Sequence, residues 1–429
     1  MFYRFIYLLG RNFRNPSIKK QLVFLKETES WTLEELENYQ LKKLQELINF
    51  AFTNSSYYKQ RMLDLEIVPS DIKNLKDIKK LPVLSKKEIL KYNSKIHTNF
   101  KFKKKFKAIT SGTTGQSLEF YRDEFADSFN RASIIKGYEV FDVKPWDRNG
   151  YFWGFSFSFA KKIKTIILDR FQNRFRVFSY DEKAFNKFVK KLQKAKYIHG
   201  YSSMLYQAAK IINENKMLKP EKILMVKGTS EKIFEKYQEE VEKAFGLKMI
   251  SEYGATESGI IAFECPSGNM HINMEGVIVE EIDNEILVTN LQMKSFPIIR
   301  YKLGDYIKLS SKNKQCDCGK KHLILEDITG RVGSNIYGVK QIYPSFIFYY
   351  IFKNLSNNDN IVLNYQIIQE EKGSLTFKLE QTLNEKEYIK LKNEIYKYFN
   401  DDMKIEIKQN SNLNTFKGKL KSFISKVNE

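Results

Sequence analysis

Residues 110–117 read Thr-Ser-Gly-Thr-Thr-Gly-Gln-Ser, a segment that holds five hydroxyl side chains and two glycines. Glycines let a backbone approach a polyphosphate closely, and backbone amides and hydroxyls donate hydrogen bonds to its oxygens. No Gly-Lys-Ser/Thr ends the segment, so it is not a Walker loop. A surface loop can have the same composition, and the segment alone does not distinguish the two interpretations.

Four further segments follow along the chain and favour the phosphate loop. Residues 253–257 read Tyr-Gly-Ala-Thr-Glu and come just after an expected strand, where binding sites of α/β proteins form. Arg-Tyr-Lys-Leu-Gly-Asp at 300–305, Gly-Arg at 330–331 and Lys-Gly-Lys at 417–419 come next. In this order the five segments resemble the core motifs of the adenylate-forming superfamily, which comprises acyl-coenzyme A synthetases, nonribosomal peptide adenylation domains and luciferases.

Within that superfamily the sequence is most similar to the phenylacetate–coenzyme A ligase group, which includes related proteins of capsular polysaccharide biosynthesis clusters. Leu118 stands where many members of the superfamily have a lysine. Residues 199–205, His-Gly-Tyr-Ser-Ser-Met-Leu, resemble the Gly-Tyr-Pro-Ser segment of this group. The resemblance spans about residues 40–425.

The resemblance implies which residues contact the phosphates of ATP. Thr256 would contact the α-phosphate, and Glu257 would ligate Mg²⁺, which prefers carboxylate and phosphate oxygens. Lys419 would stabilise the charge that develops between the carboxylate and the α-phosphate as pyrophosphate leaves. The β- and γ-phosphates would be held by the loop residues Ser111, Gly112, Thr113, Thr114 and Gly115.

The resemblance also implies which residues bind the nucleoside. Asp305 would accept hydrogen bonds from the ribose hydroxyls, and Arg331 would lie at a domain hinge near the ribose. The adenine would be bordered by Gly228, Thr229 and Ser230. Further nucleotide contacts are expected from Tyr253 and Gly254.

Each assignment has a plainer alternative. Glu257 also fits a surface carboxylate, Asp305 a turn residue, Arg331 a structural arginine, and Lys419 a solvated lysine in a lysine-rich tail. The sequence departs from the family at the hinge, where residues 332–335 contain no aspartate to act as the pivot for domain rotation. Either the glycine in that segment supplies the flexibility or the second half-reaction differs.

The pattern of the chain predicts an α/β protein with two domains. Strands and helices alternate through its middle, whereas after residue 331 we expect two strands joined by a Glu-Glu-Lys-Gly turn, a helix over 384–400 and a further strand at 403–407. We therefore expect a large N-terminal adenylation domain of mixed sheets and helices over 1–330, which binds ATP and the carboxylate. A small mobile C-terminal α+β lid domain would occupy residues 331–429.

Two helices can be delimited from their end signals. Thr32 and Glu35 form the pattern of a capping box before an apolar-periodic segment that runs to about residue 62. Ser230 is expected to precede a second helix, which Gly246 ends.

The three cysteines fall in two short loops. Cys265 lies shortly before His271, and Cys316 and Cys318 form a tight pair. Three cysteines and a histidine match a closed structural Zn²⁺ site, with His322 as a substitute for His271. Reduced, unligated thiols are the alternative.

Composition limits the class of protein. Hydrophobic residues make up 42% of the 429, so we expect packed domains rather than disorder. No apolar run approaches the length of a transmembrane helix, and Met1–Phe13 lacks a signal cleavage site. With few cysteines as well, we expect a cytoplasmic protein.

The formal net charge is +21. A basic surface attracts polyanions, and we expect solvated background charge or contact with an anionic substrate or the inner membrane surface. No nucleic-acid-binding motif is present, so we expect no nucleic-acid partner.

These observations predict an enzyme that activates a small carboxylic acid with ATP and transfers the acyl group to a thiol, coenzyme A in the resembled family, or to an amine such as an amino-sugar. A non-catalytic homologue that binds a nucleotide or glycan at a membrane-surface assembly is the alternative. Aromatic residues at 153, 155, 157 and 159 suggest an acyl pocket or simply core. The acid, the acceptor and the oligomeric state stay open.

Overall fold

The computed structural model describes residues 1–110, 118–152, 159–177, 182–331, 335–340, 342–343, 345, 347–359, 361, 363–413, 415–416, 419–420 and 422–427. The acyl-pocket candidates at 153, 155 and 157 lie outside these ranges. Among the described residues, no helix is both long and apolar enough to cross a bilayer.

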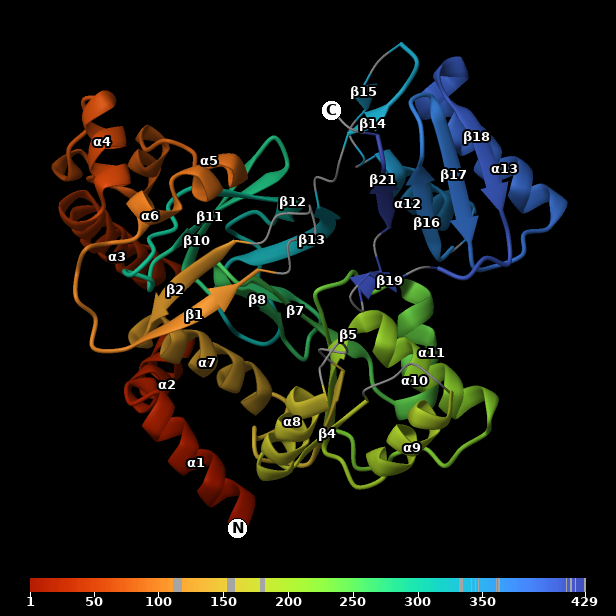
Figure 1. Cartoon of the computed structure of the whole chain (residues 1–429), viewed down its shortest axis with the longest axis horizontal. Coiled ribbons are helices and arrows are strands. Elements are labelled where there is room, and N and C mark those ends of the chain that lie inside the picture. The colour runs from red at the N-terminus through yellow and green to blue at the C-terminus, as the bar shows by residue number, and fades with distance from the viewer. Residues whose placement is uncertain are drawn as a thin grey trace.

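An eleven-stranded mixed sheet extends through the first 331 residues (Figure 1). Its strands lie in the order β10-β11-β12-β13-β9-β8-β7-β6-β5-β3-β4. The β3–β7 half is parallel, and from β7 onward neighbouring strands are antiparallel. The strands are β3 (Asn149–Phe152), β4 (Arg174–Arg176), β5 (Tyr197–Tyr201), β6 (Met225–Thr229), β7 (Met249–Ala255), β8 (Gly259–Glu264), β9 (Met270–Ile272), β10 (Val277–Ile282), β11 (Glu285–Asn290), β12 (Tyr301–Leu309) and β13 (Ile324–Arg331).

Helices and one β-hairpin complete this part of the chain. The hairpin pairs β1 (Lys105–Ile109) with β2 (Glu119–Asp123). Buried apolar side chains from the helices join those of the strands in two large clusters, one at each half of the sheet. The helices are α1 (Phe2–Arg14), α2 (Ile18–Glu27), α3 (Leu33–Asn54), α4 (Ser56–Asp64), α5 (Lys86–Lys91), α6 (Asn93–Ile96), α7 (Glu124–Glu139), α8 (Phe159–Phe171), α9 (Glu182–Leu192), α10 (Ser202–Glu214) and α11 (Glu235–Phe245).

The predicted helix ends are partly confirmed. Thr32 and Glu35 form the capping box of α3, with the Thr32 amide 2.7 Å from Glu35 Oε2. The helix ends at Asn54, and the segment to 64 continues as a separate helix after Ser55. The helix predicted after Ser230 is present and ends at Gly246, but it begins later than expected: α11 starts at Glu235 with Phe234 as its N-cap, and Ser230, with a φ of 66°, lies between β6 and this helix.

The C-terminal residues form a separate four-stranded sheet in the order β18-β17-β16-β21 (Figure 1). This unit has its own apolar core, which includes Ile367, Phe377 and Ile395. Since β13 ends at Arg331 and β14 begins at Ile336, the change of sheet falls close to the proposed boundary. The elements are β14 (Ile336–Tyr337), β15 (Ile342–Tyr343), α12 (Ile347–Asp359), β16 (Tyr365–Gln369), β17 (Ser374–Leu379), α13 (Glu385–Phe399), β18 (Lys404–Lys408), β19 (Thr415–Phe416), β20 (Lys419–Leu420) and β21 (Phe423–Ser425).

Candidate functional site

The predicted nucleotide residues gather at one edge of the large sheet. Strands β6 and β7 are parallel, with Gly228 opposite Ser251 and Thr229 opposite Glu252. The carboxyl ends of parallel strands meet at the same edge, where ligands of α/β proteins bind. Residues 228–230 and 253–257 therefore emerge side by side. Thr229 Oγ1 joins the two strands by donating to the Glu252 carbonyl at 3.3 Å.

Gly254 permits a close turn at this edge. A Cβ at this position would lie 2.4 Å from the carbonyl oxygen of Gly259, a separation that real Cβ atoms essentially never show. The turn from β7 to β8 is further held by Ser258 Oγ, which accepts from the Ala255 amide at 3.2 Å. Thr256 and Glu257 lie inside this turn, and Ser258 is its third residue.

Asp305 contacts two of the other predicted nucleotide residues. The Tyr253 hydroxyl donates to Asp305 Oδ2 at 2.7 Å, which joins the motif at 253–257 to the one at 300–305. Asp305 on β12 is also directly opposite Arg331 on β13 in the antiparallel ladder. The structure describes Arg331 through its backbone alone. The three residues thus form one corner of the candidate site.

Glu257 is buried, with only 6% of its surface exposed. The Tyr301 hydroxyl donates to its Oε1 at 3.3 Å. A carboxylate in such a position argues against the alternative of a solvated surface residue. Its oxygens have the chemistry that Mg²⁺ prefers, so the donor set fits the predicted ion.

The predicted phosphate loop connects the two strands of the β1–β2 hairpin. Its residues Ser111, Gly112, Thr113, Thr114 and Gly115 lie outside the described residues. The two residues that flank the loop are paired: the Thr110 amide donates to the Leu118 carbonyl at 2.9 Å, and the Leu118 amide donates to Thr110 Oγ1 at 2.8 Å.

Arg122 links this hairpin to the turn at 256–257. Its guanidinium donates to the Thr256 carbonyl and lies 3.5 Å from Asp127 Oδ1. Asp127 is fixed in turn by Arg131 Nε at 2.8 Å and by Asn15 Nδ2 at 2.9 Å. Burial alone would raise the pKa of Asp127, but Arg131 and its other partners lower the pKa below the usual range. The carboxylate therefore stays ionised and holds Arg122 in place.

Arg122 and Tyr301 contact the candidate residues Thr256 and Glu257, and the sequence motifs did not indicate either contact. Tyr301 lies inside the segment at 300–305, but nothing in the spacing indicates that it contacts Glu257. Arg122 lies on β2, the strand that follows the predicted phosphate loop. The signal in the sequence that could have indicated it is a positive charge in a strand next to that loop.

Lys419, the predicted adenylation catalyst, lies on β20, which pairs with β19 through Phe416. The structure describes its backbone only, and residues 417 and 418 lie outside the described ranges. In Figure 1, β19 lies between the four-stranded sheet and α11. The role of this lysine stays a prediction.

The structure brings together the side chains of Cys265, His271, Cys316 and Cys318, whose candidate ligand atoms all lie within 4.8 Å of one another. The Sγ atoms of Cys265 and Cys316 are 3.6 Å apart, and Cys318 Sγ is 3.2 Å from His271 Nε2. A disulfide needs about 2.05 Å between sulfurs. A tetrahedral ion with Zn–S bonds of about 2.3 Å and Zn–N bonds of about 2.0 Å needs edges near 3.8 and 3.5 Å, so the cluster fits zinc.

The imidazole of His271 is oriented for metal binding. Its Nδ1 lies 3.2 Å from the His322 carbonyl oxygen, which selects the tautomer with a proton on Nδ1 and leaves Nε2 toward Cys318. Burial lowers the pKa of His271 to about 4, so the ring is neutral at pH 7. His322, the predicted substitute ligand, takes a different place outside the cluster.

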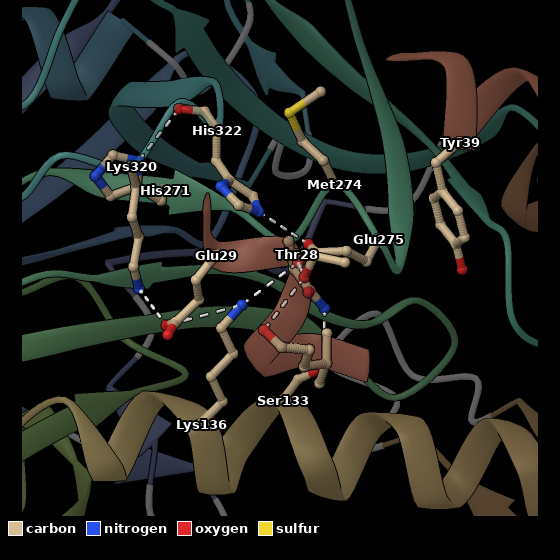
Figure 2. Close-up of polar contacts among 12 residues, drawn as sticks. Thr28, Glu29, Tyr39, Ser133, Lys136, His271, Met274, Glu275, Lys320 and His322 are labelled. Carbon is tan, nitrogen blue, oxygen red and sulfur yellow. Dashed lines mark hydrogen bonds and ion pairs between the residues drawn. The ribbon is translucent and has the colours of Figure 1, made fainter. Parts of the chain in front are cut away.

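A polar network beside the cluster explains the position of His322 (Figure 2). Its Nε2 lies 3.1 Å from Oε2 of Glu275, a carboxylate that is 1% exposed. Glu275 also accepts from Thr28 and lies 3.4 Å from Lys136 Nζ on α7. Burial by itself raises the pKa of Glu275, but His322 and Lys136 reverse this and lower it. The network ties the loop that carries Cys316 and Cys318 to α7 and to the segment after α2.

No protein-family model matches the chain. A curated relative, Protein CapK of Staphylococcus aureus, is 23% identical over 300 residues, which covers 65% of this chain and 63% of that protein. The aligned part thus spans less than two thirds of that relative's length.

Solved structures of a 2-hydroxyisobutyryl-CoA ligase are similar over nearly the whole chain. The one in the postadenylation state with 2-HIB-AMP matches with a TM-score of 0.69 and 14% identity, covering 93% of this chain and 91% of that one. The same ligase with 2-HIB-AMP and CoA in the thioesterification state has a TM-score of 0.59 and 16% identity at the same coverage. At such identities the likeness shows a shared fold.

Proposed function

We propose that this chain, which has the fold of the adenylate-forming ligases, is an enzyme that uses ATP to activate a carboxylic acid as its acyl-adenylate. The observation that carries the proposal is that separate motifs meet at one edge of the large sheet. Tyr253 donates a hydrogen bond to Asp305, and the turn that holds Thr256 and Glu257 comes directly after the strand that carries Tyr253. Its support from the comparisons is that solved ligases of this fold hold acyl-AMP.

The first half-reaction would join the acid to AMP. A carboxylate oxygen of the acid attacks the α-phosphorus of ATP, the bond to the bridging oxygen breaks, and pyrophosphate leaves. Thr256 would contact the α-phosphate, while Arg122 fixes the carbonyl of the same residue. Glu257 would hold Mg²⁺, which supplies positive charge to the phosphate oxygens when it is bound. Lys419 would stabilise the charge that builds during the attack.

The nucleoside would be held at the opposite corner of the site. Asp305 would accept from the ribose hydroxyls, oriented by the Tyr253 hydroxyl, and Arg331 would lie close by in the ladder. The adenine would be bordered by residues 228–230 at the end of β6.

In the second half-reaction a thiol or amine attacks the acyl carbonyl and AMP leaves. A neighbour of the same fold binds CoA, which favours a coenzyme A thiol. An amine such as an amino-sugar would give an amide instead, in keeping with the likeness to proteins of surface polysaccharide biosynthesis. Incubation of the full chain with a preformed acyl-AMP and either CoA or candidate amines, followed by mass spectrometry of the products, distinguishes the two acceptors.

We also propose that Cys265, His271, Cys316 and Cys318 bind a structural Zn²⁺ ion. The ion would close two loops, the β8–β9 turn and the β12–β13 connection, onto each other. All four ligand positions are filled by the protein, which is typical of structural rather than catalytic zinc.

The test of the activity is acid-dependent release of pyrophosphate from ATP, measured with the full chain, Mg²⁺ and a panel of aliphatic and aromatic acids. We expect at least one acid to raise the release well above the acid-free rate. An inactive homologue would bind ATP by calorimetry yet release no pyrophosphate with any acid. The Glu257→Gln variant serves as the control, because it keeps the size of the side chain while removing the proposed magnesium ligand.

A further inference from the structure

Helix α1 presents an apolar face that nothing in the described structure covers. Phe2, Phe5, Leu9 and Phe13 are between 63% and 82% exposed, and no residue of the helix is buried. Their spacing of three, seven and eleven residues from the first places all four on one face of an α-helix. The body of the protein contacts other parts of the helix, as where the Tyr7 ring lies 5.7 Å from that of Trp146.

Helix α8 has a face of the same kind. Ile163, Ile166, Ile167 and Phe171 are exposed and recur at helical spacing. On the opposite side of the helix, Asp169 is buried and forms an ion pair with Arg176 on β4, which anchors the helix to the sheet. Its apolar stripe therefore points away from the sheet.

The two helices are neighbours, although about 150 residues separate them in the sequence. They contact each other and lie next to each other in Figure 1. Their exposed apolar side chains therefore lie on adjacent parts of the surface, which we call the α1–α8 surface.

The charge of the α1–α8 surface has a single sign. Helix α1 contains no aspartate or glutamate, and the one acidic residue of α8 is the buried and paired Asp169. Arg4, Lys164 and Arg170 are exposed on the two helices, and Lys104 adds a further cation, its Nζ 5.2 Å from the centre of the Phe13 ring. Apolar side chains bordered by cations are typical of helices that lie in the interface of an anionic bilayer.

We propose that the α1–α8 surface binds the headgroup region of an anionic lipid bilayer. The apolar side chains of both helices would enter the boundary between headgroups and acyl chains, while the surrounding cations contact lipid phosphates. A second copy of the chain is a poorer occupant, because a two-fold contact would bring cations against cations with no exposed carboxylate on either helix to pair with them. This surface involves none of the proposed nucleotide residues, so the inference stands apart from the proposed function.

Flotation of the full chain with vesicles tests the proposal. We expect it to float with vesicles rich in phosphatidylglycerol and far less with pure phosphatidylcholine, and the binding to fall as salt is raised to about 1 M, where the Debye length is only about 3 Å. The variant Phe5→Ser/Leu9→Ser/Ile163→Ser/Ile167→Ser should lower the partition coefficient by at least about a hundredfold, since each apolar side chain contributes about tenfold. These residues are exposed, so the variant should fold.

A matched control is Leu218→Ser, which changes another exposed apolar residue, 74% accessible, in the segment between α10 and β6. It should bind vesicles as the unchanged protein does. A charge variant, Arg4→Gln/Lys164→Gln/Arg170→Gln, should lose about fivefold in affinity for each cation removed and leave the residual binding to phosphatidylcholine unaltered.

Equal flotation of the four-serine variant and the unchanged protein would overturn the proposal, as would equal binding to the two kinds of vesicle. Sedimentation velocity gives the remaining outcome: a dimer without lipid that the serine changes convert to a monomer would assign the surface to self-association instead. Acid-dependent pyrophosphate release should be the same in all these variants, which separates a failure of the lipid proposal from a failure of the proposed enzyme activity.

Discussion

The hydrogen bond between Tyr253 and Asp305 permits a direct test of the ribose assignment. Tyr253→Phe removes one hydroxyl and leaves the ring, so the 2.7 Å contact to Asp305 Oδ2 is lost without a cavity. A hydrogen bond to a charged group is worth about 1.5–3 kcal/mol. Both side chains are partly exposed, and water can replace the hydroxyl. We therefore expect a loss of about 1 kcal/mol in ATP binding, or about fivefold in Kd.

Asp305→Ala should cost more, because it removes the acceptor itself. We expect about 1.5–3 kcal/mol in ATP binding, measured by calorimetry. In the double variant, Tyr253→Phe should add almost nothing, since the carboxylate that it orients is absent. The cycle should therefore give a coupling energy of about 1 kcal/mol. Tyr396→Phe, a change at a tyrosine that is 53% exposed on α13, is the control and should leave Kd unchanged.

Two results would refute this reasoning. Unchanged nucleotide affinity in Asp305→Ala would show that this carboxylate does not hold the ribose. Additive effects of the two changes, with no coupling, would show that Tyr253 acts on the nucleotide independently of Asp305. In both cases thermal unfolding of the variants should be checked first, so that a folding defect is not mistaken for a binding defect.

Further predictions concern the lysine, the zinc cluster and the buried carboxylate. Lys419→Ala should lower acid-dependent pyrophosphate release about a hundred- to a thousand-fold while keeping most of the rate of acyl transfer from supplied acyl-AMP. Lys417→Ala is the control and should change little. Equal losses in both half-reactions would exclude the catalytic role of Lys419. Metal analysis should find about one zinc per chain, and protein without zinc would contradict the assignment. Cys316→Ser should remove the ion and lower Tm sharply, since structural zinc contributes about 10–16 kcal/mol of apparent binding energy in small peptides. Glu275→Ala should destabilise the fold at pH 7 by about 3–5 kcal/mol, because it removes a buried carboxylate that contacts Lys136, His322 and Thr28. The pKa of Glu275 is lower in the folded protein than in the unfolded chain, so the carboxylate stabilises the fold above its unfolded-state pKa, and this stabilisation is lost as the pH falls below about 4. Denaturant unfolding should therefore show the free energies of unfolding of the variant and the unchanged protein converging in acid. A constant difference between them would count against the network.

The sequence predicted the fold class because helices, strands and their ends follow local patterns, whereas the site residues were named from a resemblance to a family. The capping box at Thr32 and the stop at Gly246 involve residues a few positions apart, and both are as expected. The end of α3 at Asn54 was not predictable from periodicity, because the apolar pattern continues into α4 through the break at Ser55. Ser230 has the side chain of a helix N-cap, but Phe234 occupies the N-cap position of α11, which begins at Glu235.

Contacts between distant segments were beyond the reach of the sequence. The bond from Arg122 to the Thr256 carbonyl joins residues 134 positions apart, and no spacing rule connects them. The choice between His271 and His322 as the cluster histidine likewise depends on Glu275, a buried carboxylate that no motif marks. Sequence motifs therefore indicate candidate residues, but the contacts of these residues depend on tertiary packing.

The cysteine cluster lies at the start of a strand whose other end reaches the candidate nucleotide site. His271 on β9 is paired with Ile324, the first residue of β13, and Cys316 and Cys318 lie just before that strand. The same strand ends at Arg331, opposite Asp305, and its ladder with β12 already shifts register twice. Because β13 is one continuous strand, a clamp at its first residue also restrains the position of its last residue. Loss of zinc would release this restraint, so we expect it to shift Arg331, and the C-terminal unit that follows, relative to Asp305.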